Sequence, residues 1–417
     1  MSPPPVVVVS PWRREPYRLL FPLGVLLAWT GVLHWLLLAT GFIQEYRSVF
    51  HAFAQIEGFM TCFAVGFLFT LIPRRTGTAP PAAWQVAVAL AAPVAVTTFA
   101  WFEKWALSQI PWLLLLAVLI QFAVSRFRSP GAGPQIPNSF VWVILALVMG
   151  VGGSVLAGVG ASLGEEMFWL HEIGRAIVLQ GLFTALVLGV GGMLLPVVTR
   201  GVGPAAGPAG AGEPGGVAGA GGATGAKVLH LIAGLAFIAT FFVEVLVSVR
   251  LGFALRAAIV LATLLASAEL WRLPTVPGLH RRLIWIAAWC LPAGYACVAA
   301  FPQYPKAGLH VVFIGCFALL AFCISVHVVL SHGGAPGLLN ARPWPIALLG
   351  GLVMSALGLR VLVNVYPSHV YRWLGLAAAA FLSATVVWAL FLLSALRGPA
   401  KDARARVAAD KLAGAAS

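Results

Sequence analysis

The chain has 417 residues, of which 61% are hydrophobic and only 9% are charged. Its mean hydropathy is +0.96. Soluble domains carry about 25% charged residues, so this chain has too little charge to coat a water-facing surface of its length. The composition therefore excludes a mainly soluble protein and indicates one that lies within a lipid bilayer.

About twelve apolar runs of roughly 20 residues follow one another, each bounded by charge or by Pro and Gly. As a helix, each run can cross about 30 Å of hydrocarbon at 1.5 Å per residue. Barrel strands would be shorter and would alternate in hydrophobicity. The sequence therefore predicts an all-α, polytopic transmembrane helix bundle. The expected spans are 17–39, 49–73, 84–102, 106–125, 139–161, 171–198, 228–249, 251–271, 283–301, 307–331, 344–365 and 370–396.

A single long interruption, rich in Gly and Pro, divides these runs into two sets of six. We expect it to be a flexible cytoplasmic linker. A 6+6 layout is also found in secondary transporters, whose halves are often structural repeats. The predicted parts are a first six-helix half at 1–200, the linker at 201–226, a second half at 227–396 and a basic tail at 397–417.

The net charge of +14 could suggest a nucleic-acid partner, but the distribution of the charge points elsewhere. With the N-terminus placed inside, most Lys and Arg fall in the inner loops and tails, as in the positive-inside pattern. The excess of Lys and Arg thus indicates which loops face the cytoplasm and predicts contact with anionic lipid. We expect no nucleic-acid partner. Both termini are predicted to be cytoplasmic.

The histidines are the most informative polar residues, because ionisable groups in hydrocarbon are expensive and mark candidate sites. Five are expected near the outer boundary, at matched depth on different helices. Imidazoles placed in this way can hold haem b, and neutral imidazole also binds copper. Hydrogen-bonded interfacial histidines are the alternative. The five are His34, His51, His171, His310 and His369.

The second expected span carries a polar stripe at helical spacing, formed by His51, Gln55, Gly58 and Cys62. These positions share one face of the helix. Such a stripe suits a flat macrocycle held by His51, with Gly58 leaving room for its ring; a close helix–helix contact at Gly58 is the alternative. Among the other polar residues, Glu244 is placed to pair with Arg360 or Arg256.

Four stretches are similar to motifs of one family. They are RREPYRLLF at 13–21; HAFAQIEGF at 51–59 with GFLFT at 66–70 and PRRTG at 73–77; GG at 191–192 followed by Pro196, Thr199 and Arg200; and LH at 309–310 with Gly315 and LSHGG at 330–334. The chain resembles the NnrS family, polytopic haem- and copper-containing membrane proteins linked to nitric oxide stress and denitrification.

The resemblance carries His51, His310 and His332 over as candidate metal or haem ligands. The polar stripe adds Gln55, and the depth argument adds His171 and His34, as candidate cofactor-binding residues. The implied cofactors are haem b and copper. His332 lies about 33 Å from His310 along a straight helix, so these two cannot ligate one metal. Four positions depart from the family pattern. Phe53 and Ala54 replace a histidine and a glutamate, which weakens the expectation of copper, and Met193 and His327 replace arginines.

The expected function is that of an NnrS-like membrane haem protein that responds to nitric oxide in a bacterial inner membrane. Its partners would be the bilayer, a small gaseous or redox-active ligand such as nitric oxide, and a respiratory-chain protein. The alternatives are a metal-free secondary transporter, a haem-copper redox enzyme, or an accessory protein for a respiratory haem-copper oxidase. The resemblance leaves open whether the chain catalyses a reaction.

Overall fold

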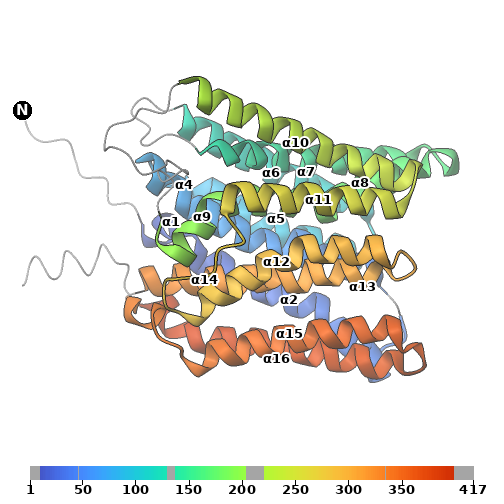
Figure 1. Ribbon diagram of the computed structural model, residues 1–417. Helices are drawn as coiled ribbons and strands as arrows, with labels where there is room; N and C mark the ends of the chain where they lie inside the picture. The colour runs from blue at the N-terminus through green and yellow to red at the C-terminus, as the bar shows by residue number, and fades with distance from the viewer. Residues whose placement is uncertain (1–9, 46, 129–136, 203–219, 334, 399–417) are drawn as a thin grey trace, which may run out of the picture.

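The computed structural model describes residues 10–45, 47–128, 137–202, 220–333 and 335–398 (Figure 1). Within these residues every regular element is helical, and twelve helical segments are long and apolar enough to cross a membrane. The prediction of an all-α bundle with about twelve spans is therefore confirmed. Two expected ranges, 17–39 and 344–365, coincide with the spans observed, and the others differ by a few residues at their ends.

Most of the spans consist mainly of one α-helix, as expected of Leu- and Ala-rich runs whose backbone polar groups must be satisfied internally in lipid. These helices are α2 (Tyr17–Ala39), α5 (Ala83–Trp101), α6 (Trp105–Phe127), α7 (Val141–Ser162), α10 (Ala220–Leu246), α11 (Val249–Ala268), α12 (Leu279–Ala300), α15 (Trp344–Val365) and α16 (Val370–Arg397).

Three spans are instead interrupted by a π-helical segment, which the sequence did not predict. π-Helical turns are rare in proteins and occur frequently at functional sites. The second span is α3 (Ser48–Phe53), η1 (Ala54–Met60) and α4 (Thr61–Thr76); the sixth is α8 (Phe168–Ala176), η4 (Ile177–Gly181) and α9 (Leu182–Arg200); the tenth is α13 (Pro305–His310), η5 (Val311–Ala318) and α14 (Leu319–His332).

The start of the first span and the end of the last lie at the same end of the bundle (Figure 1). The Arg18 guanidinium donates hydrogen bonds to the carbonyl oxygens of Leu396 and Gly398, each at 2.6 Å. An even number of spans requires this arrangement. That this end faces the cytoplasm stays a prediction.

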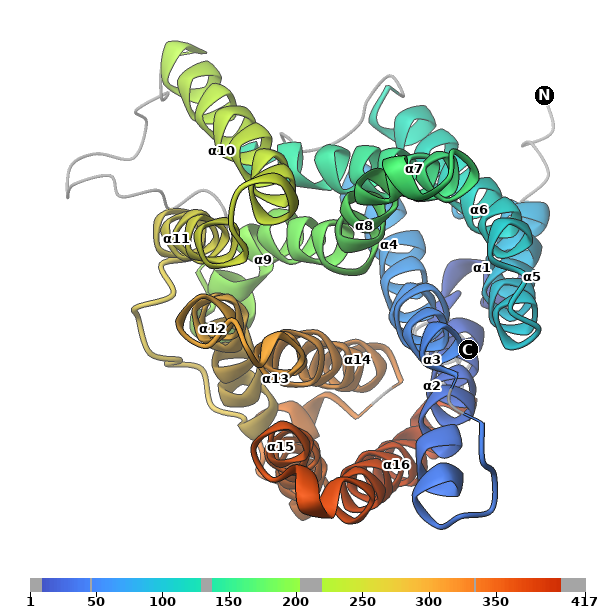
Figure 2. The same ribbon diagram turned by 90° about the vertical axis from the view of Figure 1, so that its right-hand side faces the viewer.

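The two sets of six spans pack directly against each other (Figure 2). Helix α2 lies along α16, α9 contacts α11 and α12, and α4 contacts α14. The predicted linker at 201–226 falls mostly outside the described residues, and α10 begins within it at Ala220. Nearly all of the predicted tail at 397–417 also lies outside them.

A buried ion pair lies deep in the second set of spans. The Arg256 side chain is fully buried and donates to the Glu244 carboxylate at 2.7 Å, as the sequence allowed. It also donates to Gln180 at 2.8 Å and to the Thr240 hydroxyl at 3.1 Å. Since a buried charge is tolerated only when paired and hydrogen-bonded, this cluster ties α10, α11 and η4 together.

Candidate functional site

A cavity of about 360 Å³ lies between the spans, with lining residues near the starts of the second, sixth and tenth spans. Ligand pockets in proteins have volumes of about 300–1,000 Å³, so this space is large enough for one. All three π-helical segments line it: η1 through Gln55 and Ile56, η4 through Leu179, and η5 through Phe313 and Ile314. A π-helical turn adds a residue to the helix and so redirects the side chains beside it. The cavity is thus built where the three interrupted spans converge.

His51 and Gln55, two of the residues that the sequence singled out, line this cavity from the second span. The His51 Nδ1 bonds to the Gly31 carbonyl oxygen at 3.0 Å, and the Gln55 amide donates to the Ala28 carbonyl at 3.1 Å. Gly31 permits this close approach of α2, since a Cβ there would meet the Gln55 Nε2 at 2.6 Å and the Ala54 Cβ at 2.7 Å. The backbone of α2 therefore fixes the orientation of both side chains.

His310 lines the same cavity from the tenth span. Its Nδ1 bonds to the Lys306 carbonyl oxygen, one helical turn earlier, at 2.6 Å. The Phe313 ring lies beside it, with ring centroids 6.0 Å apart. The sequence thus named two histidines 259 positions apart, and the fold brings both to one cavity.

The hydrogen bonds of these two histidines determine which nitrogen can act as a ligand. A carbonyl oxygen only accepts, so the Nδ1 of His51 and the Nδ1 of His310 each carry the proton. Each Nε2 then holds the lone pair of a neutral imidazole. Histidines that bind metals almost always donate their other N–H to a carbonyl or carboxylate in this way.

Three cationic side chains line the same cavity: Arg175 from α8, Lys306 from α13 and Arg360 from α15. Arg175 also forms a half-exposed ion pair with Glu172 at 2.9 Å. Guanidinium and ammonium groups bind carboxylates and phosphates through charge-assisted hydrogen bonds. The cavity therefore combines two imidazoles with a positive lining suited to an anionic group.

The rest of the lining is apolar and largely aromatic, with Trp35, Phe59 and Phe381 among its members. Phe53 occupies the position at which the family pattern has a second histidine. Its ring is 2% exposed and meets the Trp105 ring edge-on at 4.7 Å. At this position the cavity is therefore lined by a phenylalanine ring instead of an imidazole.

Three of the five histidines expected near the outer boundary do not line this cavity: His34, His171 and the exposed His369. The His34 Nε2 accepts the backbone N–H of Arg47 at 3.1 Å. The His171 Nδ1 bonds to the Ala157 carbonyl at 2.9 Å, and its ring lies against Trp105 and Phe168. His34 and His171 thus contact neighbouring elements instead of the cavity. The predicted membrane depth did not distinguish them from His51 and His310.

His332 lies at the opposite end of the tenth span, as its distance in sequence from His310 implied. Its ring bonds to the Arg74 guanidinium and lies 6.2 Å from the Tyr17 ring. Arg74 in turn pairs with Glu15 at 3.2 Å. His332 is thus part of a polar cluster at the end of the bundle where the first span begins.

Sequence reasoning missed several parts of this picture. It considered Arg360 only as a partner of Glu244 and did not bring Arg360, Arg175 and Lys306 to one site. The charge of these residues was visible, but the helix face that carries each was not. Among the described residues, no group of three or more His, Cys, Asp or Glu is placed to hold a metal ion.

Comparison with known proteins extends over almost the whole chain. The profile of the NnrS family, described as NnrS protein, matches residues 11–399. Searches of the curated proteins and of the solved structures gave no match. Because the family profile covers nearly all of its 417 residues, the chain belongs to the NnrS family.

Proposed function

We propose that this protein is a membrane haem protein that binds nitric oxide or a related small molecule as part of the response to nitrosative stress. The observation that carries the proposal is the placement of His51 and His310 on one cavity, each with its Nδ1 hydrogen-bonded to a backbone carbonyl. Membership of the NnrS family supports the link to nitric oxide. We place the protein in a bacterial inner membrane, with a respiratory-chain protein as electron donor.

The residues fit haem b in three respects. Two imidazoles, from the second and tenth spans, would hold the haem iron through their Nε2 atoms. Phe59, Phe313 and Phe381 supply aromatic surface for the flat ring. The three cations of the cavity lining suit the two propionate carboxylates of haem. Bound there, haem would supply an iron centre for one-electron chemistry, and for gas binding once one of the two imidazoles leaves the iron.

The protein's own contribution is orientation and exclusion of water. Gly31 and the Lys306 carbonyl hold the two imidazoles in one tautomer. The Gln55 side chain, anchored to the Ala28 carbonyl, presents a polar group beside His51. The aromatic lining keeps the surroundings of a bound group apolar, which strengthens electrostatic interactions there.

The same residues fit copper less well. Copper sites in proteins commonly use three or more His, Cys or Met ligands. Here His51 and His310 provide two, and among the described residues no third His, Cys, Asp or Glu joins them. Met60 also lines the cavity, so a copper site here would depend on its thioether as the third ligand. Copper stays the second cofactor of the proposal, after haem.

The test is to measure haem in the purified protein with a pyridine haemochrome assay. We expect stoichiometric b-type haem in the wild type and loss of haem in His51→Ala and in His310→Ala. His369→Ala is the matched control, because His369 is an exposed outer histidine that does not line the cavity. It should retain the cofactor.

A clean wild-type preparation without haem would overturn the proposal. The cationic cavity would then favour the alternative, a secondary transporter for an anionic substrate. An accessory role beside a respiratory oxidase would be supported by haem that is present but does not react with nitric oxide.

A further inference from the structure

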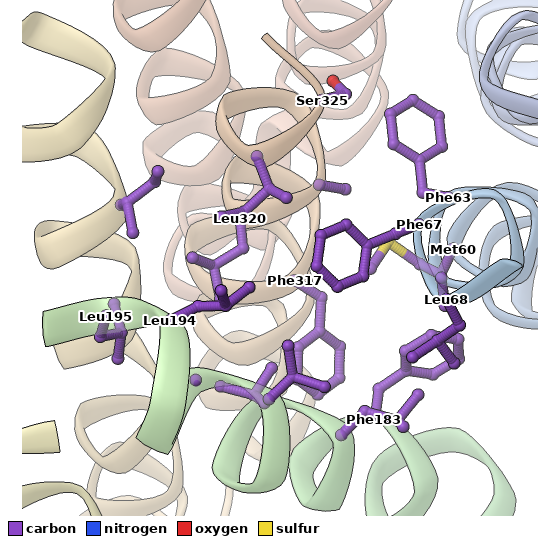
Figure 3. A pocket seen from close by; sticks show the side chains of 18 of the residues that line it. Met60, Phe63, Phe67, Leu68, Phe183, Leu194, Leu195, Phe317, Leu320 and Ser325 are labelled. Carbon is purple, nitrogen blue, oxygen red and sulfur yellow. The ribbon is translucent and has the colours of Figure 1, made fainter. Parts of the chain in front are cut away.

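A second cavity lies next to the first, between the second, sixth, ninth and tenth spans (Figure 3). Its volume is about 140 Å³. Met60, the last residue of η1, lines both this cavity and the cavity that contains His51 and His310. Met60 is the one residue that the linings of the two cavities have in common, so the two spaces are neighbours at this residue.

The lining of this second cavity is apolar, with Phe63, Phe67, Phe183 and Phe317 contributing rings (Figure 3). The one polar side chain is Ser325, and the protein already satisfies its hydroxyl. That hydroxyl donates to the Phe322 carbonyl at 2.8 Å and accepts the Trp388 indole N–H at 2.8 Å. A buried water needs two to four polar partners, so nothing here favours water.

The size of this cavity limits what it can hold. An engineered apolar cavity of about 150 Å³ stays dry and binds benzene or xenon. The cavity here has a similar volume, about 140 Å³, but is partly open, and it has room for small apolar molecules.

Gly191 helps to keep this space open. A Cβ built there meets only Leu195 at 3.5 Å and Val187 at 3.9 Å, both on the same helix. No atom of a neighbouring span lies within 4 Å of that position. A side chain at 191 would therefore enter the cavity instead of striking another helix.

We propose that this apolar cavity binds small neutral gas molecules and passes them to the histidine cavity beside Met60. Neutral diatomic gases such as nitric oxide concentrate in apolar surroundings, because burial there avoids the free-energy cost of opening a cavity in water. The flexible thioether of Met60 can change rotamer and so let a diatomic pass. The delivery step rests on the proposed function, whereas the binding step does not.

The first experiment uses xenon as the probe on the full-length purified protein, with binding followed by ¹²⁹Xe NMR. We expect Gly191→Leu to weaken xenon binding about tenfold or more, since filling the void removes the contacts that hold an apolar guest. Gly351→Leu is the matched control, because Gly351 is exposed and has no atom within 4 Å of a built Cβ. Ala321→Leu, on the facing α14, is a second filling variant in case Gly191→Leu does not fold.

The second experiment measures the association rate of nitric oxide with the reduced, haem-loaded protein. Gly191→Leu should slow association by about tenfold, and Gly351→Leu should leave it unchanged. Xenon binding that is absent from the wild type, or insensitive to both filling variants, would overturn the proposal.

The two proposals fail in distinguishable ways. Protein that carries no haem but loses its xenon site in Gly191→Leu would overturn the haem proposal and the delivery step while supporting gas binding. Protein that keeps its haem and its normal nitric oxide association in Gly191→Leu would overturn delivery and leave the haem proposal intact.

Discussion

Two pairs of histidines lie in this bundle, and they differ in what their ring nitrogens face. His51 and His310 point to one cavity, and each bonds through Nδ1 to a backbone carbonyl. His280 and His327 bond to each other, with 3.1 Å between the His280 Nε2 and the His327 Nδ1. His280 is fully buried between α12 and the neighbouring spans. The histidines of the first pair line a cavity, whereas those of the second pair hydrogen-bond to each other.

A parallel difference separates the arginines. Arg256 is enclosed, with partners on three sides. Arg175 and Arg360 line the cavity, and the Arg175–Glu172 pair is largely exposed. The residue type alone therefore does not identify the candidate site, because a side chain must also line the cavity. The predictions below separate groups that stabilise the fold from groups that hold a ligand.

The largest effect on stability is expected at Arg256. Replacement by Met leaves the Glu244 carboxylate and the Gln180 amide without their main partner, and breaking a buried ion pair lowers the unfolding free energy by about 3–5 kcal/mol. The matched control is Arg175→Met, which breaks a half-exposed Arg–Glu pair worth at most about 1 kcal/mol. Denaturant unfolding in detergent measures both changes. A loss of about 1 kcal/mol or less in Arg256→Met, no larger than that in Arg175→Met, would show that the Arg256 cluster does not stabilise the fold.

A smaller effect is expected for the second histidine pair. His280→Ala removes one partner of a buried hydrogen bond and should lower the unfolding free energy by about 1–3 kcal/mol. The haem content should stay at the wild-type level, because this pair does not line the cavity of His51 and His310. Loss of haem in His280→Ala, with the fold intact by circular dichroism, would contradict the distinction between the two pairs.

The smallest effect is expected at the cavity cations. Arg360→Gln removes one positive charge from the cavity lining, and we expect haem affinity to fall about tenfold, or about 1.4 kcal/mol. The optical spectrum should not change, since neither axial histidine is altered. Arg372→Gln is the control, because Arg372 is exposed on α16 and does not line the cavity. Transfer of haem to apomyoglobin would measure the affinities, and identical transfer rates would exclude a role for Arg360 in holding the propionates.

Hydropathy was sufficient to predict most of the fold, because a chain that crosses a bilayer must form long apolar helices or a closed barrel. The span Tyr17–Ala39 was predicted to the residue, and the buried partner of Glu244 was correctly one of the two arginines named. The π-helical segments were not predicted. They depend on packing between spans, which a local sequence pattern does not contain.

The candidate site was partly visible in the sequence. His51 and His310 were singled out by depth and by resemblance, and the structure brings both to one cavity. His34 and His171 were named on the same depth argument but lie against other elements. The membrane depth of a residue follows from its position along a helix. The element that its side chain contacts depends on how that helix is rotated against the neighbouring helices, and one sequence alone does not determine this rotation.

The central claim is that His51 and His310 would both hold the proposed haem. Electron paramagnetic resonance of the oxidised protein, compared between the wild type and the single variants His51→Gly and His310→Gly with added imidazole, tests it most directly. We expect a low-spin signal of bis-histidine type in the wild type, loss of that signal in each variant, and its recovery when imidazole fills the space left by the side chain. A low-spin signal that survives in either variant without imidazole would contradict the claim.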